Sequence, residues 1–230
     1  MSVCILFIGC AREKISFYKR VIARQKQVFK DFKISSFIFT WNPVTNPKTK
    51  FCDVVFEYNY DKSQFQAELR DDVDGIFFFD QPDLGSLEHC QNLAPIVHKE
   101  LSNLASQTLI CEADRIPLGL IREADRFDFG CWCRLDCVCQ PKDISEWLTS
   151  QVSVPRNFWC GANYINDHYL VTTFDNLIKI FSLETNEKKL LASRSWNMEE
   201  FHRHQISRFN LPIVVRDVSE YIIRETKQFV

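Results

Sequence analysis

Glycine is scarce in this chain, with six glycines among 230 residues, and only Gly9 precedes Gly75. A Gly-rich phosphate-binding loop of the kind that nucleotidyltransferases usually need is therefore hard to find. Long apolar runs are also missing, because Val3–Ile8 and Ile76–Phe79 are far shorter than the roughly 20 residues of a membrane-spanning helix. We therefore expect no segment that crosses a membrane.

An excess of charge of either sign is missing as well: 28 Lys and Arg stand against 30 Asp and Glu, for a net charge of -2. This balance argues against nucleic acid as a partner. The start of the chain lacks the basic leader and the small-residue cleavage site of an export signal. We therefore expect a cytoplasmic protein whose ten cysteines are reduced thiols.

The composition predicts a single α/β domain over residues 1–230, because 46% of the residues are hydrophobic and no repeat or linker divides the chain. Val3–Ile8 reads as a buried strand, residues 13–32 carry apolar side chains at helical spacing, and Ile34–Phe39 reads as a second strand. Such a unit has parallel strands, and the loops that follow them lie at one edge of the sheet.

The first half is therefore expected to be Rossmann-type, with a mainly parallel sheet that continues into an α+β later half. The other expected strands are Asp53–Glu57, Ile76–Phe79, Phe129–Gln140, Pro212–Val215 and Tyr221–Arg224, and the other expected helices lie between Pro95 and Arg126 and at Ile144–Leu148, Asn176–Leu183 and Met198–Phe209.

The expected strand Phe129–Gln140 alternates strictly, which places four cysteines on one face. Same-face neighbours in a strand stand about 7 Å apart, too far for four sulfurs to gather around one zinc ion. We therefore expect metal-free thiols that pack as small hydrophobic side chains. Arg134 and Asp136 lie on the opposite face, either as a structural ion pair or as part of a site for a charged ligand.

Two further polar groups are candidate sites. Asn166, Asp167 and His168 follow one another and suit proton transfer, metal binding or a capped turn. Glu199 and Glu200 open the expected helix Met198–Phe209, where acidic residues are commonly solvated.

Taken together, these landmarks resemble the WavE-like bacterial glycosyltransferases of lipopolysaccharide and capsule synthesis, which have a GT-A-like fold. The resemblance covers most of the chain. Its motifs, in order, are the Gly-Cys-Ala-Arg loop at 9–12, Phe37 to Asn42 with its Thr-Trp pair, Ser106-Gln107, Arg126 to Phe129, Arg134-Leu135-Asp136, Asn166 to Tyr169 and Met198 to Glu200.

The resemblance implies transfer of a sugar from a nucleotide sugar to a glycan or lipid-linked acceptor in surface polysaccharide synthesis. It implies Asp167, Glu199 and Glu200 as catalytic candidates. The implied nucleotide-sugar contacts are Gly9, Arg12, Thr40, Trp41, Asn42, Gln107, Arg134, Asp136, Asn166 and His168. Arg134 stands where glycosyltransferases often carry a first acid, so a divalent cation, Mn²⁺ or Mg²⁺, stays open at Asp136.

Two other functions stay open: a nucleotidyltransferase, and a non-catalytic nucleotide- or glycan-binding domain on a transferase-like fold.

Residues 1–30 also carry a local excess of Lys and Arg. A solvated helix face is one reading of this excess. A salt-sensitive peripheral contact with an anionic membrane is expected if the acceptor is lipid-linked.

Overall fold

The computed structural model describes residues 1–9, 13–41, 61–79, 127–156, 168–181 and 198–223. A seven-stranded sheet is formed by β1 (Ser2–Ile8), β2 (Lys33–Trp41), β3 (Gly75–Phe79), β4 (Phe129–Arg134), β6 (Val152–Pro155), β7 (Tyr169–Thr173) and β8 (Ile213–Arg216). A second, two-stranded sheet pairs β5 (Cys137–Pro141) with β9 (Val218–Ile223). The helices are α1 (Ile15–Val28), α2 (Lys62–Leu69), α5 (Phe174–Phe181), α7 (Met198–Arg208) and the short 3-10 helix η4 (Ile144–Glu146).

The large sheet has the order β3-β2-β1-β4-β7-β6-β8 and runs through both halves of the chain. Strands β3, β2, β1 and β4 are parallel, β7 is antiparallel to both of its neighbours, and β6 and β8 are parallel. The protein is therefore α/β, with a mixed, mainly parallel sheet that is compatible with a Rossmann-like fold. This confirms the coarse expectation of an α/β fold whose mainly parallel sheet continues into the later half.

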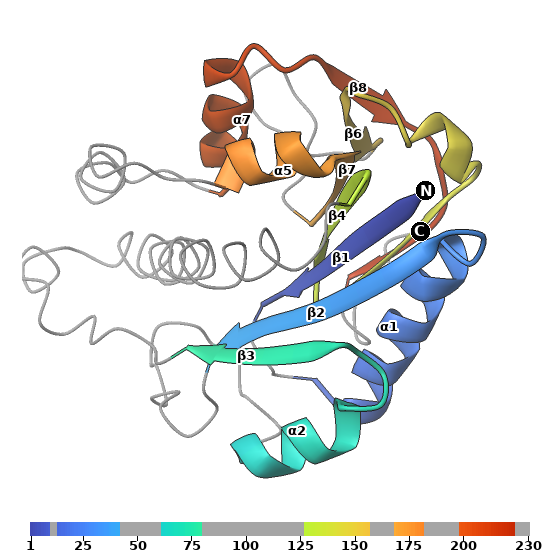
Figure 1. Ribbon diagram of the computed structural model, residues 1–230, viewed down its shortest axis with the longest axis vertical. Helices are drawn as coiled ribbons and strands as arrows, with labels where there is room; N and C mark the ends of the chain where they lie inside the picture. Colours follow the sequence, from blue (N-terminus) through green and yellow to red (C-terminus); the bar gives the residue numbers. More distant parts are fainter. Residues whose placement is uncertain (10–12, 42–60, 80–126, 157–167, 182–197, 224–230) are drawn as a thin grey trace, which may run out of the picture.

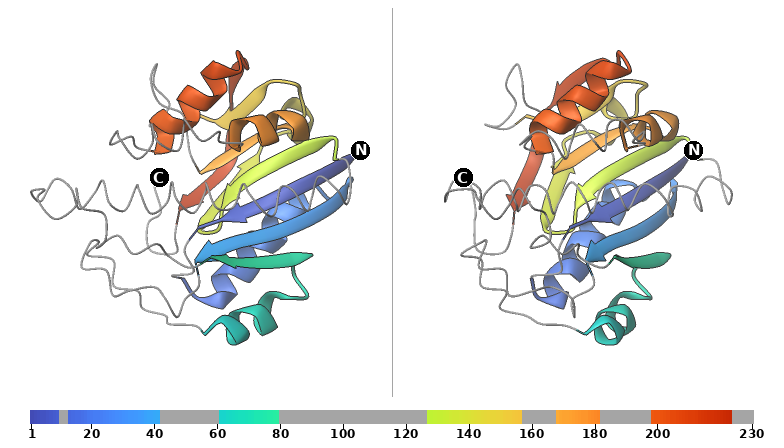
Figure 2. Two further views of the ribbon diagram at one scale, coloured as in Figure 1. Left: turned by 60° about the vertical axis from the view of Figure 1, so that its left-hand side comes forward. Right: turned by 90° about the vertical axis from the view of Figure 1, so that its left-hand side faces the viewer.

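Helices cover both faces of the large sheet, with α5 and α7 on one side and α1 and α2 on the other (Figures 1 and 2). The alternation along β1 explains the two layers: Val3, Ile5 and Phe7 pack into the core beneath α1, whereas Cys4 and Leu6 pack into the core beneath α5. Because β1 lies between β2 and β4, its side chains are buried on both faces, as in other parallel sheets.

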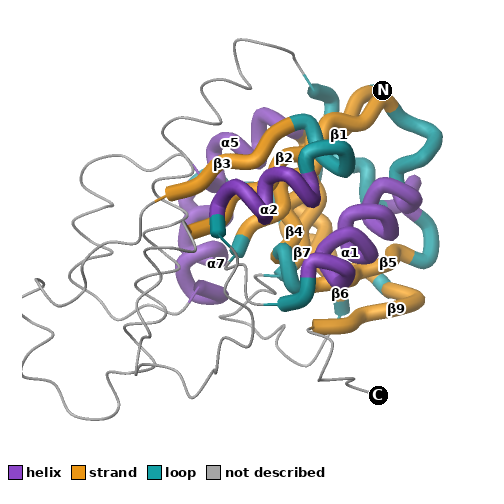
Figure 3. Tube along the Cα trace, turned by 90° about the horizontal axis from the view of Figure 1, so that it is seen from below, coloured by secondary structure: helices purple, strands orange, loops and turns teal. Residues whose placement is uncertain are grey.

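Helix α1 confirms the helix expected over residues 13–32. It buries a stripe of side chains against the sheet: Phe17, Tyr18, Val21, Ile22 and Gln25. The Gln25 amide donates to the Cys139 carbonyl at 2.7 Å, and Arg24 forms an ion pair with Glu220. These two contacts attach α1 to the β5–β9 sheet, and Figure 3 shows the helix beside both strands.

The single strand expected at Phe129–Gln140 is wrong. The chain turns at Leu135 and Asp136, so β4 stays in the large sheet and β5 leaves it to pair with β9. The period-two pattern continues through the turn because Leu135 is fully buried and packs into the same core cluster as the cysteines of β4 and β5. Periodicity alone therefore could not reveal the break.

Other expectations are confirmed or fall outside the described residues. The strands expected at Ile34–Phe39 and Ile76–Phe79 lie within β2 and β3, and the expected helix Asn176–Leu183 overlaps α5. The strand expected at Asp53–Glu57 and the helix expected between Pro95 and Arg126 lie outside the described residues. Three elements were not anticipated: α2, β6 and β7.

No helix among the described residues is long and apolar enough to cross a membrane.

Candidate functional site

Backbone hydrogen bonds join the ends of four strands at the carboxyl edge of the parallel half. Gly9 N donates to Phe39 O at 3.1 Å, and Leu135 N donates to Ile8 O at 2.8 Å. Arg134 N donates to His168 O at 2.7 Å, which adds the start of the antiparallel strand β7. This edge therefore gathers Gly9, the Arg134–Asp136 turn and His168 from three distant parts of the sequence.

The strand order changes direction at this same place. The chain leaves β1 for β2 and β3 on one side, whereas β4 lies on the other side of β1. In open α/β sheets, ligands bind outside the carboxyl ends of the strands at such a switch point. The turn after β4 and the residue after β1 border this position in the structure.

Gly9 has a backbone requirement of its own. Its φ is +146°, a conformation that residues with a side chain rarely adopt. A Cβ at this position would have space, since its nearest neighbour would be Leu135 Cβ at 3.7 Å. Glycine is therefore needed here for the conformation that lets the chain leave β1, and not for lack of room.

Arg134 and Asp136 form a bidentate ion pair across the turn between β4 and β5. Arg134 Nε donates to Asp136 Oδ1 at 2.8 Å, and Nη2 donates to Oδ2 at 2.9 Å. The Asp136 side chain is 5% exposed and that of Arg134 is 22% exposed. The pair neutralises a buried carboxylate and holds the guanidinium in one orientation beside the switch point.

His168 contacts a residue that the sequence did not single out. Its Nδ1 lies within hydrogen-bonding distance of the Tyr221 hydroxyl, and the two rings are tilted by 35° at a centroid distance of 6.2 Å. Tyr221 lies on β9 opposite Cys139 of β5. No pattern in the sequence indicates this contact, because it depends on the pairing of β5 with β9, and β5 was expected to continue the preceding strand.

The other predicted residues are placed less directly. Thr40 lies near the end of β2, but its side chain is fully buried and its hydroxyl has no hydrogen-bond partner. Trp41 is the last residue of β2. Glu199 and Glu200 lie in the first turn of α7, which leads directly into β8 and so begins towards the carboxyl end of that strand. Five predicted residues lie outside the described ranges: Arg12, Asn42, Gln107, Asn166 and Asp167.

The described residues do not fit a divalent cation at Asp136. Both carboxylate oxygens accept hydrogen bonds from Arg134, which places a positive charge next to the carboxylate and disfavours a second cation there. Within the described ranges, no group of three or more His, Cys, Asp or Glu side chains could hold a metal ion.

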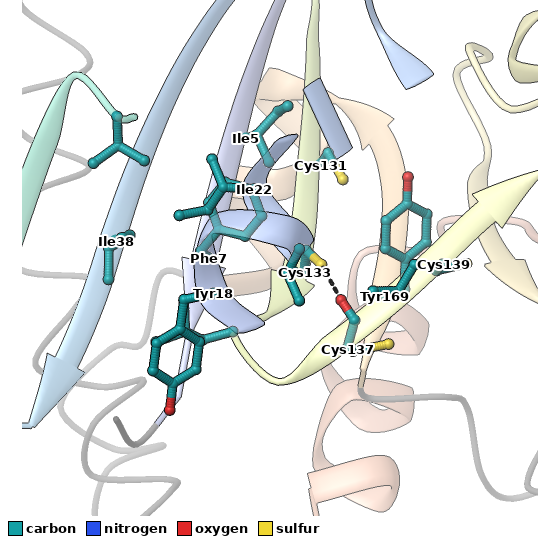
Figure 4. Close-up of a cluster of buried hydrophobic side chains, with 14 of the residues drawn as sticks. Ile5, Phe7, Tyr18, Ile22, Ile38, Cys131, Cys133, Cys137, Cys139 and Tyr169 are labelled. Carbon is teal, nitrogen blue, oxygen red and sulfur yellow. Dashed lines mark hydrogen bonds between the residues drawn. The ribbon is translucent and has the colours of Figure 1, made fainter. Parts of the chain in front are cut away.

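The cysteines of β4 and β5 lie in one buried cluster (Figure 4) and pack as small hydrophobic side chains, as expected, although a turn and not one continuous strand places them there. Cys133 Sγ donates to the Cys137 carbonyl at 3.5 Å, and both side chains are fully buried free thiols. Burial raises the pKa of Cys131 to about 12, and it also raises the pKa of Cys133 and Cys139. These thiols are therefore protonated at neutral pH and unsuited to act as nucleophiles.

The basic residues of α1 contact the protein itself. Lys19 forms an ion pair with Glu68 of α2 at 3.0 Å, and Lys26 donates to the Asp72 carbonyl. The Arg20 guanidinium lies over the Phe17 ring at 5.2 Å. With Arg24 paired to Glu220, much of this positive charge serves to hold neighbouring elements together.

Comparison with protein-family models and with curated proteins finds no match to this chain.

Proposed function

We propose that this protein is a glycosyltransferase that moves a sugar from a nucleotide sugar to a glycan or lipid-linked acceptor. One observation carries the proposal: the turn after β4, the end of β1 and the start of β7 are hydrogen-bonded together at the switch point of the sheet. The residues that resemble the WavE-like motifs, Gly9, Arg134, Asp136 and His168, are the ones that meet there. A Rossmann-type half that runs on through an antiparallel strand also supports the GT-A-like fold.

Sugar transfer requires a binding site for the nucleotide, positive charge at the leaving diphosphate and a base that takes the proton of the acceptor hydroxyl. In the proposal, the nucleotide lies outside the ends of β1 and β2, and Trp41 stacks on its base. Arg134, oriented by Asp136, contacts the diphosphate as it leaves. A guanidinium suits this role because its planar fork matches phosphate oxygens.

The proposed base is Asp167, which directly precedes His168 in the sequence. Glu199 and Glu200 are the alternatives, because α7 presents its first turn towards the carboxyl end of β8. No step of the proposal passes through a metal ion, because the guanidinium occupies both oxygens of Asp136.

Calorimetric titration with UDP, GDP, CDP, ADP and dTDP, in EDTA and then with Mn²⁺, tests the proposal. We expect one nucleotide to bind in EDTA, with weaker binding in Arg134→Lys, because lysine keeps the charge but lacks the fork. Arg70→Gln is the matched control, since Arg70 is exposed and pairs with its neighbour Asp71. Incubation with the corresponding nucleotide sugars should then release that nucleoside diphosphate. Failure of every nucleotide to bind would overturn the proposal.

A second candidate, a non-catalytic nucleotide- or glycan-binding domain, is favoured by one observation. Both oxygens of the Asp136 carboxylate accept hydrogen bonds from Arg134, which favours a structural role for Asp136 over action on a substrate. Nucleotide binding without release of nucleoside diphosphate from any nucleotide sugar, in the presence of acceptor glycans, would favour this candidate.

A further inference from the structure

Three arginines stand at the carboxyl ends of strands in the large sheet, and they differ in how their charge is neutralised. Arg134 at the end of β4 is paired with Asp136. Arg156, directly after β6, is paired with Asp217 through its Nε at 2.9 Å. Arg216, the last residue of β8, makes no ion pair with any described residue, and its Nε is buried without a hydrogen-bond partner.

Arg216 is nevertheless built firmly into the fold. Its carbonyl accepts a hydrogen bond from Arg156 N at 2.7 Å, and it lies opposite Pro155 in the parallel pairing of β6 with β8. Its side chain is partly buried. A cation that loses hydration without gaining an anionic partner is unfavourable, so a partly buried guanidinium normally pairs with a carboxylate or a ligand anion.

The adjacent acidic residue in the sequence, Asp217, does not supply that anion. Asp217 follows Arg216 directly, but its Oδ1 accepts from Arg156 Nε. The net charge of these three side chains is positive, because Arg156 and Arg216 are two cations and Asp217 is one anion. The guanidinium fork suits oxyanions such as phosphate and carboxylate groups.

We propose that Arg216 is the centre of an oxyanion-binding subsite at the carboxyl ends of β6 and β8. The subsite is distinct from the switch point, because β7 and β6 separate β8 from β4 and adjacent strands lie about 4.8 Å apart, which places it about 14 Å away. It takes a phosphate or carboxylate group of a ligand. The inference does not depend on the proposed transfer reaction.

Nitrogen-15 correlation spectra of the arginine Nε–H groups test the subsite directly. Arg216→Lys removes the Nε–H and so assigns its signal. At constant ionic strength in chloride, we expect inorganic phosphate or acetate to shift the Arg216 signal in a saturable manner. The anion whose titration saturates identifies the chemistry of the ligand. The signals of Arg134 and Arg156 should stay nearly constant.

Two variants complete the experiment. Calorimetric titration measures anion binding by the variants, because those at Arg216 lack the Arg216 signal. Arg216→Gln should weaken phosphate or acetate binding by about tenfold or more, the effect expected for loss of a charged hydrogen bond. Arg70→Gln, which removes an exposed arginine that pairs with its neighbour Asp71, should bind the same anion with nearly unchanged affinity. If Arg216→Gln does not fold, Arg216→Lys serves instead, with the same expected loss of saturable binding.

The inference is overturned if neither anion gives a saturable shift, or if all arginine signals respond alike. It is equally overturned if Arg216→Gln, or Arg216→Lys in its place, binds as tightly as the wild type. Nucleoside diphosphate titration of the wild-type protein separates this result from the proposed function. A protein that binds no nucleotide but shows a saturable Arg216 signal would refute the proposed function and leave the subsite intact.

Discussion

Both carboxylate oxygens of Asp136 accept hydrogen bonds from Arg134, the residue two positions before it, at 2.8 and 2.9 Å. In a regular strand, residues two apart point the same way but stand about 7 Å apart. The turn between β4 and β5 brings the two side chains together and lets β5 join a different sheet. The ion pair is therefore part of the turn that ends β4, and it is also part of the candidate site.

Asp136→Asn should destabilise the protein. The substitution leaves the partly buried Arg134 guanidinium without its charged partner, and breaking such a pair typically costs about 3 kcal/mol in the free energy of unfolding. Urea unfolding measures this loss. Replacing both residues, as in Arg134→Met with Asp136→Leu, should recover part of it, since no charge is then left unpaired. A double variant less stable than Asp136→Asn would contradict this account.

Tyr221→Phe should loosen the His168 ring. The substitution removes the hydroxyl next to His168 Nδ1 but keeps the aromatic ring. We expect the nitrogen-15 signals of the His168 imidazole to move towards those of a ring that exchanges between tautomers, with little change in the unfolding midpoint. Tyr60→Phe, a tyrosine distant in sequence, is a control for the general effect of losing a hydroxyl. Unchanged His168 signals would show that Tyr221 does not orient the ring.

The sequence was sufficient to predict the first strand, the first helix and the position of Gly9 and the end of the second strand at one edge of the sheet. These features follow from local periodicity and from the geometry of parallel strands. It was insufficient at Leu135, because a buried residue inside a turn continues the alternation of a strand. The contact of Tyr221 with His168 was missed for a related reason: it depends on which strand pairs with β9, and no local pattern encodes that choice.

Gly130→Ala should separate α5 from the sheet. A Cβ on Gly130 would lie 3.1 Å from Leu177 Cβ and closer still to its Cδ2, so the helix or the strand must move. Overpacking of this kind costs about 1 to 3 kcal/mol. Adding Leu177→Ala should make the double variant more stable than the sum of the single effects predicts. If the losses in the free energy of unfolding are additive, the contact between residue 130 and Leu177 is not their cause.

Vesicle binding tests whether α1 contacts a membrane. Lys19, Arg20 and Lys26 each contact their own protein, so we expect only weak, salt-sensitive association with anionic vesicles and none with neutral ones. Changing Lys19, Arg20, Lys26 and Lys30 to Gln should reduce sedimentation with anionic vesicles. Because these contacts also join α1 to α2, circular dichroism must first show that the variant is folded. Equal binding to neutral vesicles would refute an electrostatic contact.

The buried thiols should make the protein sensitive to alkaline pH. An exposed cysteine in the unfolded chain loses its proton near its ordinary pKa of 9.0, whereas burial raises the pKa of Cys131 in the folded protein to about 12. The folded state therefore binds more protons between these values. The resulting stability is fully present below pH 9 and is lost as the pH rises from about 9 towards 12.

Urea unfolding at several pH values between 7 and 10.5 measures this dependence. One such thiol contributes a slope of up to about 1.4 kcal/mol per pH unit above its unfolded pKa. Cys131→Ala removes that contribution while leaving every other titrating group in place, so the curve for the variant should fall less steeply above pH 9. Identical slopes would mean that Cys131 titrates alike in the folded and unfolded states, and would contradict its burial beside Tyr169.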